Sequence, residues 1–478
     1  MEHVVFKYFE EISAIPRGSK NCQAISDYLV NFAKNHGLSY IQDDSLNVII
    51  KKPASVGYEK SPTVILQGHM DMVCEKTEDS SHNFLTDGLE LMTEDDYLYA
   101  NKTTLGGDDG IAIAYALAIL ADDALLHPSL EVIITTDEEI GLLGATALNT
   151  SALEGTYMIN IDSEEEDVLL VSCAGGLRSD CRLPITYEKA EGKKLTISVK
   201  GLQGGHSGGE IDKNRINATL LLARLLSELK KFSFQVSSMK GGLMDNAIPR
   251  EAVAQIVICE NEAYKIINEI KFLSEKYKNE CRTNEPDLSI IVNQGENKTY
   301  SVMTKESYEK VLFFLSTTPN GIQTMSSNIP GLVESSLNLG IFVTNDSIAQ
   351  MSYSVRSSLS SYKTYISDKL ELLTKHLGGE YCTTGDYPGW EYKKDSKLRT
   401  MYATVYENIV GKEIKIEAIH AGLECGILAE KLGDIDIIAI GPNMEDIHTT
   451  EERLSISSTI RVYDVILATL KDFCNMTK

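Results

Sequence analysis

Short apolar runs alternate with helical segments in the first third of this chain, and this alternation constrains the fold more than any other feature. Helical periodicity covers residues 4–15 and 23–36. Four short runs, rich in β-branched or aromatic residues and bounded by turn residues, are predicted strands: residues 47–50, 63–66, 131–135 and 156–161. Residues 111–120 are apolar nearly all round, so we expect a buried helix there. Strands separated by helices predict an α/β sheet that helices cover on both faces.

The middle of the chain follows a different, strand–helix–strand–strand order. Strands are predicted over residues 194–199, 252–259, 288–293, 336–343 and 348–354, and helices over residues 214–229 and 263–277. The α/β alternation returns from about residue 394 and ends in a helix at residues 458–474. We therefore predict an α/β domain with a mixed sheet, formed by residues 1–186 and 391–478. An inserted α+β domain of residues 187–390 interrupts it.

The charge composition excludes several classes of function. Asp and Glu number 69 against 45 Lys and Arg, which gives a formal net charge of −24. Such an acidic chain repels nucleic-acid phosphates and anionic membrane surfaces. No apolar run approaches the ~20 residues of a membrane span, and the N-terminal segment lacks the basic region of a signal peptide. We therefore expect a cytoplasmic protein with no nucleic-acid or membrane partner.

Histidine and carboxylate side chains gather where the predicted strands of the α/β domain end. They are His69 and Asp71, Asp108 and Asp109 before the buried helix, residues 137–139, Asp162 and His448. Ligands of open α/β sheets bind outside the carboxyl ends of the strands. A His, Asp and Glu set without thiols suits Zn²⁺ or Mn²⁺ in a catalytic site. Two metals ~3.5–4 Å apart need a shared carboxylate and about two further ligands each, and this set is large enough for both.

Each of these residues also has an ordinary structural explanation. A histidine at a strand end is more often a structural residue, and two aspartates before a helix often form its N-cap. Paired glutamates are usually a solvated charge run, Asp162 could start a turn, and His448 could cap the next helix. All of these explanations would have to hold independently at the same sheet edge. The set as a whole therefore favours a metal centre.

Four motifs at these positions resemble those of the co-catalytic di-zinc exopeptidases. They are residues 67–73 (QGHMDMV), 104–110 (TLGGDDG), 136–141 (TDEEIG) and 161–165 (IDSEE). Within that clan, the chain is most similar to the aminoacyl-histidine dipeptidases, also called cytosolic β-alanyl-histidine or Xaa-His dipeptidases. Three further stretches share that similarity: residues 204–211 (GGHSGGEI), 246–251 (NAIPRE) and 419–426 (IHAGLECG). The resemblance extends over essentially the whole chain.

The resemblance implies a role for each candidate residue. It implies two Zn²⁺ ions per subunit, with Mn²⁺ or Co²⁺ as possible substitutes, bound by five side chains: His69, Asp108, Glu139, Asp162 and His448. Asp108 is then the bridging aspartate, although Asp109 beside it is an alternative. Asp71 orients the imidazole of His69. Glu138 is the general base, which takes a proton from the attacking water and returns it to the leaving amine.

The inserted domain is implied to be a lid and dimerisation domain. By the same resemblance, His206 stabilises the oxyanion in the partner subunit of a homodimer, and Arg356 binds the substrate carboxylate. Asn246 and His420 are further candidates for that pocket. The implied activity is hydrolysis of small peptides, dipeptides of the Xaa-His type including β-alanyl-histidine. The alternatives within the clan are a tripeptidase or aminopeptidase and an N-acyl amino acid deacylase.

Two other classes of function fit the sequence less well. Residues 205–209 also match the G-x-S-x-G nucleophile elbow, but a loop separates Ser207 from the preceding predicted strand. A serine triad would also leave the acidic strand ends unexplained. The same glycines lack the Gly-Lys-[Ser/Thr] that would follow in a phosphate-binding loop. A non-catalytic binding protein is disfavoured because the candidate base, bridge and ligands are all present.

Overall fold

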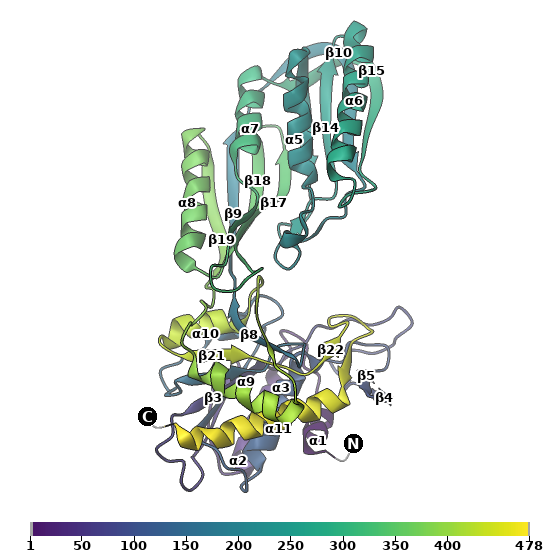
Figure 1. Cartoon of the computed structure of the whole chain (residues 1–478). Coiled ribbons are helices and arrows are strands. Elements are labelled where there is room, and N and C mark those ends of the chain that lie inside the picture. The colour runs from purple at the N-terminus through teal and green to yellow at the C-terminus, as the bar shows by residue number, and fades with distance from the viewer. Residues whose placement is uncertain (1–2, 477–478) are drawn as a thin grey trace. The chain divides into compact units, whose positions relative to one another are not determined.

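The computed structural model describes residues 3–476, which form two compact units (Figure 1). Within the described range, the first unit comprises residues 3–173, 390–418 and 423–476. The second unit comprises residues 174–389 and 419–422. It begins before residue 187 because the strand at residues 175–184 pairs with two strands of the second unit's sheet.

An eight-stranded mixed sheet forms the centre of the first unit, with strand order β1-β2-β6-β3-β7-β21-β8-β20. The bounds are β1 Ser39–Gln42, β2 Val48–Lys52, β3 Val64–His69, β6 Leu130–Thr135, β7 Tyr157–Asn160, β8 Val168–Cys173, β20 Lys415–Ile419 and β21 Asp436–Ala439. β6, β3 and β7 are parallel neighbours, so their carboxyl ends lie at one edge of the sheet. Every side chain of β3 and β6 is buried, which requires cover on both faces.

Helices provide most of that cover. They are α1 Val4–Ser13, α2 Gln23–Asn35, α3 Gly107–Ala121, α4 Leu143–Ala147, α9 Lys397–Val410, α10 Glu424–Leu432 and α11 Ile456–Asp472. The predicted apolar helix is α3, in which every residue from Gly110 to Leu120 is buried. It packs against β3 and α1, and its N-terminus therefore lies beside the carboxyl end of β3. A small sheet of order β22-β23-β5-β4 completes the unit, with β4 Leu91–Glu94, β5 Tyr97–Ala100, β22 Met444–Glu445 and β23 Arg453–Ser455.

A nine-stranded antiparallel sheet forms the second unit, in the order β15-β10-β14-β12-β17-β18-β9-β19 with β16 paired to β17. The bounds are β9 Gly175–Pro184, β10 Tyr187–Lys200, β12 Phe234–Gly241, β14 Ala252–Ile258, β15 Ser289–Met303, β16 Gly321–Met325, β17 Val333–Thr344, β18 Ile348–Ser357 and β19 Glu380–Tyr387. A separate two-stranded pair, β11 Gly205–His206 and β13 Ala247–Ile248, places His206 opposite Ala247.

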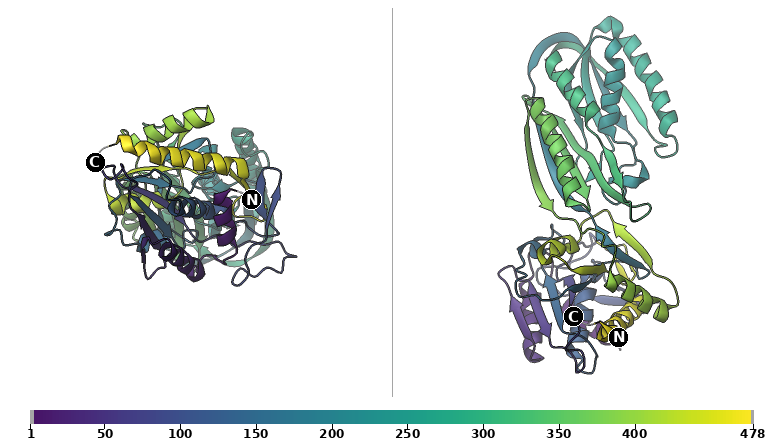
Figure 2. Two further views of the ribbon diagram at one scale, coloured as in Figure 1. Left: turned by 90° about the horizontal axis from the view of Figure 1, so that it is seen from below. Right: turned by 60° about the vertical axis from the view of Figure 1, so that its left-hand side comes forward.

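Four helices pack on this sheet: α5 Ala218–Glu228, α6 Ala263–Cys281, α7 Lys305–Thr317 and α8 Ser360–His376 (Figures 1 and 2). Their apolar side chains and those of the strands form a single continuous core. Sequence analysis predicted α5 and α6 but neither α7 nor α8. The mixed α/β sheet in one unit and the separate inserted sheet in the other confirm the predicted fold class. None of the helices among residues 3–476 is both long and apolar enough to cross a membrane.

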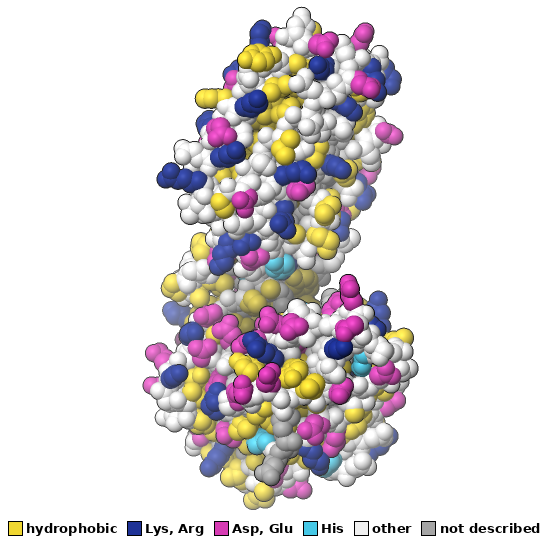
Figure 3. All heavy atoms as spheres, turned by 90° about the vertical axis from the view of Figure 1, so that its right-hand side faces the viewer, with side chains coloured by type: hydrophobic (Ala, Val, Ile, Leu, Met, Phe, Trp, Pro, Cys, Tyr) yellow, Lys and Arg dark blue, Asp and Glu magenta, His cyan; other side chains and the backbone are white. Residues whose placement is uncertain are grey.

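The acidic residues are distributed unequally between the two units. Asp and Glu outnumber Lys and Arg by more than two to one in the first unit, whereas the two kinds are nearly equal in number in the second. Figure 3 shows one face of the molecule, on which acidic side chains gather over the first unit. The whole of the formal net charge of −24 therefore belongs to the unit that carries the candidate metal ligands.

Candidate metal centre and active site

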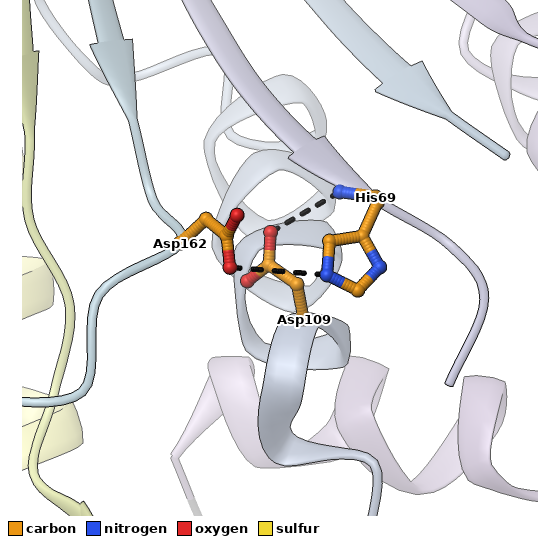
Figure 4. Close-up of side chains that lie close together, drawn as sticks. All are labelled: His69, Asp109 and Asp162. Carbon is orange, nitrogen blue, oxygen red and sulfur yellow. Dashed lines mark hydrogen bonds and ion pairs between the residues drawn. The ribbon is translucent and has the colours of Figure 1, made fainter. Parts of the chain in front are cut away.

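The candidate metal centre starts at the carboxyl end of β3, where His69 is only 1% exposed. Its Nε2 atom lies 3.1 Å from Oδ1 of Asp108 and 3.8 Å from Oδ1 of Asp162. Figure 4 shows Asp162 reaching the imidazole from the segment after β7. The other ring nitrogen, Nδ1, lies 3.4 Å from Oδ1 of Asp71. Nε2 therefore faces carboxylates with which it could share a cation, while Asp71 holds Nδ1.

Asp108 connects this group to a second one. Its Oδ2 atom lies 2.9 Å from Nε2 of His448, and that nitrogen lies 3.1 Å from Oε1 of Glu139. The two oxygens of one carboxylate thus contact two different histidines. Burial alone would raise the pKa of Asp108, but its hydrogen bonds with His448 and His69 lower it below the usual value. A carboxylate with this geometry can bridge two metal ions.

Asp109 is close to the same group but is oriented differently. Its Oδ2 atom accepts a hydrogen bond of 3.1 Å from the backbone N–H of His69 (Figure 4). Burial raises the pKa of Asp109 well above its usual value. His69, Asp109 and Asp162 also offer ligand atoms within 4.8 Å of one another, so Asp109 is an alternative ligand. We favour Asp108 as the bridge because, among residues 3–476, it alone contacts both His69 and His448.

Asp71 fixes the acidic segment that follows β6. Its Oδ1 atom accepts a hydrogen bond of 3.0 Å from the backbone N–H of Glu138, and its Oδ2 atom accepts one of 3.4 Å from Glu139. Asp71 therefore positions the candidate base as well as His69. Burial raises the pKa of Glu138 to about 8, together with the charges of Glu424 and Glu139. A carboxyl group that titrates near neutral pH can both accept and return a proton.

The donor set fits divalent cations. Three overlapping groups offer ligand atoms that lie within 4.8 Å of one another: His69 with Asp109 and Asp162, His69 with Glu138 and Glu139, and Asp108 with Glu139 and His448. Burial raises the pKa of Asp162 well above its usual value, and the charge of Asp108 adds to the effect. Buried carboxylates this close together are costly unless positive charge lies among them. Two divalent ions would supply that charge, and nitrogen and oxygen ligands suit Zn²⁺ or Mn²⁺.

The second unit holds a separate group of candidate residues around Arg356 on β18. Arg356 is 8% exposed. Nη1 of Arg356 donates to the Tyr387 hydroxyl at 3.3 Å, and Nη2 lies 3.4 Å from Nε2 of His206. Nε2 of His420 lies 2.7 Å from the Ser336 hydroxyl. Burial and the charge of Arg356 lower the pKa of His206, and they lower the pKa of His420 to about 3. Both rings are therefore neutral at pH 7.

The remaining two residues of interest in this unit lie beside His206. The backbone carbonyl of Asn246 accepts a hydrogen bond of 2.8 Å from the N–H of Ser207. Within the described part of the chain, the Asn246 side chain makes no hydrogen bond to Arg356 or His420. Ser207 follows the short strand β11, and the next α-helix, α5, begins only at Ala218. Ser207 is therefore not at a strand-to-helix corner, which a nucleophile elbow requires.

Sequence analysis missed three buried charged residues near the metal centre. Glu424 is fully buried and accepts hydrogen bonds from Gln67 at 2.5 Å and Thr135 at 2.6 Å; burial raises its pKa to about 7. Arg17 and Glu452 are 1% and 2% exposed and contact the loop before Asp108. The signal for Arg17, between Pro and Gly, was weak, whereas Glu424 lies within the stretch 419–426 that carries part of the family similarity.

Comparison with known proteins identifies the family. The family described as "Peptidase family M20/M25/M40" matches residues 65–472, which include all the candidate metal ligands. The chain belongs to this peptidase family. Among its relatives, the "Cytosol non-specific dipeptidase" of Escherichia coli (strain K12) is 34% identical over 467 residues, covering 97% of this chain and 96% of the relative.

Solved structures agree with this assignment to the M20 family. Aminoacylhistidine dipeptidase from Vibrio alginolyticus has a TM-score of 0.93 and 32% identity to this chain, and the match covers 98% of this chain and 96% of that one. Aminopeptidase PepT from Bacillus cereus ATCC 10987, at 15% identity and a TM-score of 0.57 over 98% of each chain, shares the fold. The resemblance predicted from the motifs is therefore confirmed.

Proposed function

We propose that this M20 peptidase is a metal-dependent dipeptidase that hydrolyses dipeptides of the Xaa-His type, including β-alanyl-histidine. The observation that carries the proposal is the position of Asp108, whose two carboxylate oxygens contact His69 and His448. This geometry joins two groups of ligands through one carboxylate, as a two-metal hydrolytic site requires. The names of the E. coli and V. alginolyticus relatives support the dipeptidase activity.

Five side chains would hold the metal ions. His69 and Asp162 would bind one ion, Glu139 and His448 the other, and Asp108 both. We infer Zn²⁺ at both positions, with Mn²⁺ or Co²⁺ as substitutes, because the set combines imidazole and carboxylate ligands without thiols. When bound, such a pair lowers the pKa of a water molecule and polarises the peptide carbonyl.

The chain's own residues would then move the proton and hold the substrate. The Glu138 carboxylate accepts the proton of the attacking water and returns it to the nitrogen of the leaving amine. Asp71 keeps the His69 ring and the Glu138 backbone in place. Arg356 binds the C-terminal carboxylate of the dipeptide in a bidentate pair. His206 donates to the developing oxyanion.

Asn246 and His420 belong to the same proposed pocket. The short β11–β13 pair and the Ser207 hydrogen bond keep the backbone of Asn246 beside His206. His420 is held by Ser336 and stays neutral, so it can orient a substrate without adding charge. We also infer a homodimer that forms through the second unit, in which His206 acts on the partner's substrate. The cytosol is the proposed compartment, following the name of the E. coli relative.

Hydrolysis of a peptide panel tests the proposed function. The panel contains β-alanyl-histidine, other dipeptides, tripeptides and N-acyl amino acids, assayed before and after chelation and with Zn²⁺ or Mn²⁺ added back. Cleavage that is confined to dipeptides and restored by metal is the expected result. Cleavage of tripeptides or acylated amino acids would instead indicate one of the sister activities of the clan. No cleavage with any metal would contradict the proposal.

Glu138→Ala tests the proposed base directly. The expected result is a loss of about 10²–10⁴-fold in kcat, the usual contribution of a positioned acid or base, with metal content unchanged. Glu165→Ala, a change at an exposed carboxylate after β7, is the matched control and should keep full activity. A Glu138→Ala enzyme with wild-type kcat would assign the proton transfer to another group.

A further inference from the structure

The loop that carries Asp108 is held by a carboxylate from the other end of the chain. Oε2 of Glu452 accepts hydrogen bonds from the N–H groups of Leu105 at 2.8 Å and Gly106 at 3.1 Å. Its Oε1 accepts one from Gly107 at 2.8 Å. These N–H groups lie at the N-terminus of α3, where no side chain of the helix's own N-cap accepts a hydrogen bond. Glu452 therefore caps α3 from a distance of 345 residues in the sequence.

Glu452 also follows His448 by only four residues, in the segment between β22 and β23. Its three hydrogen bonds therefore tie the segment that supplies His448 to the three residues that immediately precede Asp108. His448 and Asp108 are the pair whose side chains meet at 2.9 Å. Glu452 thus connects the chain segments that supply two proposed ligands.

Arg17 makes the corresponding connection on the other side of the loop. Its Nη1 atom donates to the backbone carbonyls of Met70 at 3.1 Å and Asp71 at 3.4 Å, directly after His69. Its Nη2 atom donates to the carbonyl of Gly106. One guanidinium therefore joins the segment of His69 and Asp71 to the loop of Asp108. The planar fork of Arg presents its N–H donors in fixed directions towards both segments, whereas an ammonium group is a single point of charge.

The glycines of this loop are explained by the same contact. A Cβ atom on Gly110 would lie 2.5 Å from Nη2 of Arg17, and one on Gly106 would lie equally close. Gly106 also has a φ of +65°, in the left-handed region that favours glycine. The guanidinium thus packs directly on the loop backbone. The Gly-Gly-Asp-Asp-Gly pattern makes room for Arg17 as well as for the turn.

We propose that Arg17 and Glu452 are positioning residues that set the geometry of His69, Asp108 and His448 and thereby determine the affinity for the metal ions. The inference rests on the proposed metal centre. Both side chains are at least 98% buried, and burying a charge is costly unless its hydrogen bonds are satisfied. If packing were their only role, apolar side chains would serve equally well at these two positions. The retained charges instead connect the three chain segments that supply these ligands.

Glu452→Gln is the first test, because Gln has the same shape but turns an NH₂ group towards backbone N–H donors. The matched control is Glu131→Gln. Glu131 is 3% exposed, and its carboxylate likewise accepts hydrogen bonds from two backbone N–H groups, those of Glu154 and Gly155. It is the second residue of β6, whereas Glu138 and Glu139 follow the opposite end of that strand. Both variants lose backbone hydrogen bonds of the same kind, but only Glu452 contacts the loop that precedes Asp108.

Zn²⁺ affinity is measured by competition with a chelator of known affinity, together with the metal-to-protein ratio and the melting temperature of the chelated protein. We expect Glu452→Gln to weaken binding of at least one ion by about 10–100-fold, as changes behind metal ligands typically do. Glu131→Gln should bind Zn²⁺ as the wild type does, even if its melting temperature falls. Equal Zn²⁺ affinity in the two variants would overturn the inference.

Arg17→Lys decides the question if Glu452→Gln does not fold. It keeps the positive charge and loses the fork, so the same weakening of Zn²⁺ binding is expected, and wild-type affinity in this variant would overturn the inference. The wild-type titration separates this inference from the proposed function. A wild-type chain that binds two ions, with variants that match the control, would contradict only the positioning role. A wild-type chain that binds no ion would overturn both.

Discussion

Arg356 hydrogen bonds to the Tyr387 hydroxyl and lies 3.4 Å from Nε2 of the His206 ring. A guanidinium in that setting can receive a carboxylate in a bidentate pair, whereas Lys offers only a point charge. We expect Arg356→Lys to raise KM for dipeptides by about 10–100-fold, the range for hydrogen bonds to charged groups. Steady-state kinetics with a dipeptide and its C-terminal amide measure this effect. The amide lacks the carboxylate, so equal losses on both substrates would contradict the proposed role.

His420, in the same pocket, makes the stability of the protein depend on pH. Burial, with the charge of Arg356, lowers its pKa to about 3 from 6.5. The unfolded chain therefore binds the proton more tightly, so this contribution to stability is complete above pH 6.5 and is lost as the pH falls towards 3. The slope is at most about 1.4 kcal/mol per pH unit. In His420→Gln, the melting temperature should fall less steeply below pH 6.5. Parallel profiles for variant and wild type would contradict this prediction.

At the scale of elements, α3 connects the core of the first unit to its candidate metal ligands. Leu117, in the middle of this helix, is fully buried, whereas Leu372 on α8 is 72% exposed. Leu117→Ala should lower the free energy of unfolding by about 2–5 kcal/mol, because it removes buried methyl groups and leaves a cavity. Leu372→Ala should change it by less than about 0.5 kcal/mol. Urea unfolding of both variants checks the comparison, and similar losses would show that α3 is not part of a rigid core.

Strong periodicity made the elements of the first unit predictable. The predicted helices at residues 4–15 and 111–120 are α1 and α3, and the predicted strands at residues 63–66 and 156–161 are β3 and β7. β15 is longer than predicted because it is an edge strand with mostly exposed residues and little alternation. α7 and α8 were missed because α8, for example, buries only a narrow apolar stripe that includes Ile366 and Leu370.

The gathering of the candidate metal ligands could be predicted because of the arrangement of the sheet. The parallel strands β6, β3 and β7 end at one edge, so residues that follow them must lie near one another. The sequence could not distinguish Asp108 from Asp109, because adjacent carboxylates differ only in the direction of their side chains. It also could not reveal Glu452 as a cap of α3, since that contact spans 345 residues and depends on the tertiary fold.

At the scale of the whole molecule, the unequal distribution of charge should affect which substrates approach the site. The unit with the candidate metal ligands carries all of the net negative charge, and the second unit is nearly neutral. A field of this sign attracts cations, including metal ions and the ammonium groups of peptides, and repels acidic side chains. Salt weakens such interactions because the screening length falls to about 8 Å at physiological ionic strength.

Substrate preference should therefore depend on ionic strength. We expect kcat/KM for alanyl-lysine to exceed that for alanyl-glutamate at low salt, and the ratio to fall severalfold as NaCl is raised to about 0.5 M, where charges are screened within a few ångströms. Alanyl-histidine, whose side chain is mostly neutral at pH 7.5, is the control and should change little. If the preference came from a shaped pocket instead of the field, the ratio would stay constant. A salt-independent ratio would therefore assign specificity to local contacts and leave the acidic surface of the first unit without a role in substrate selection.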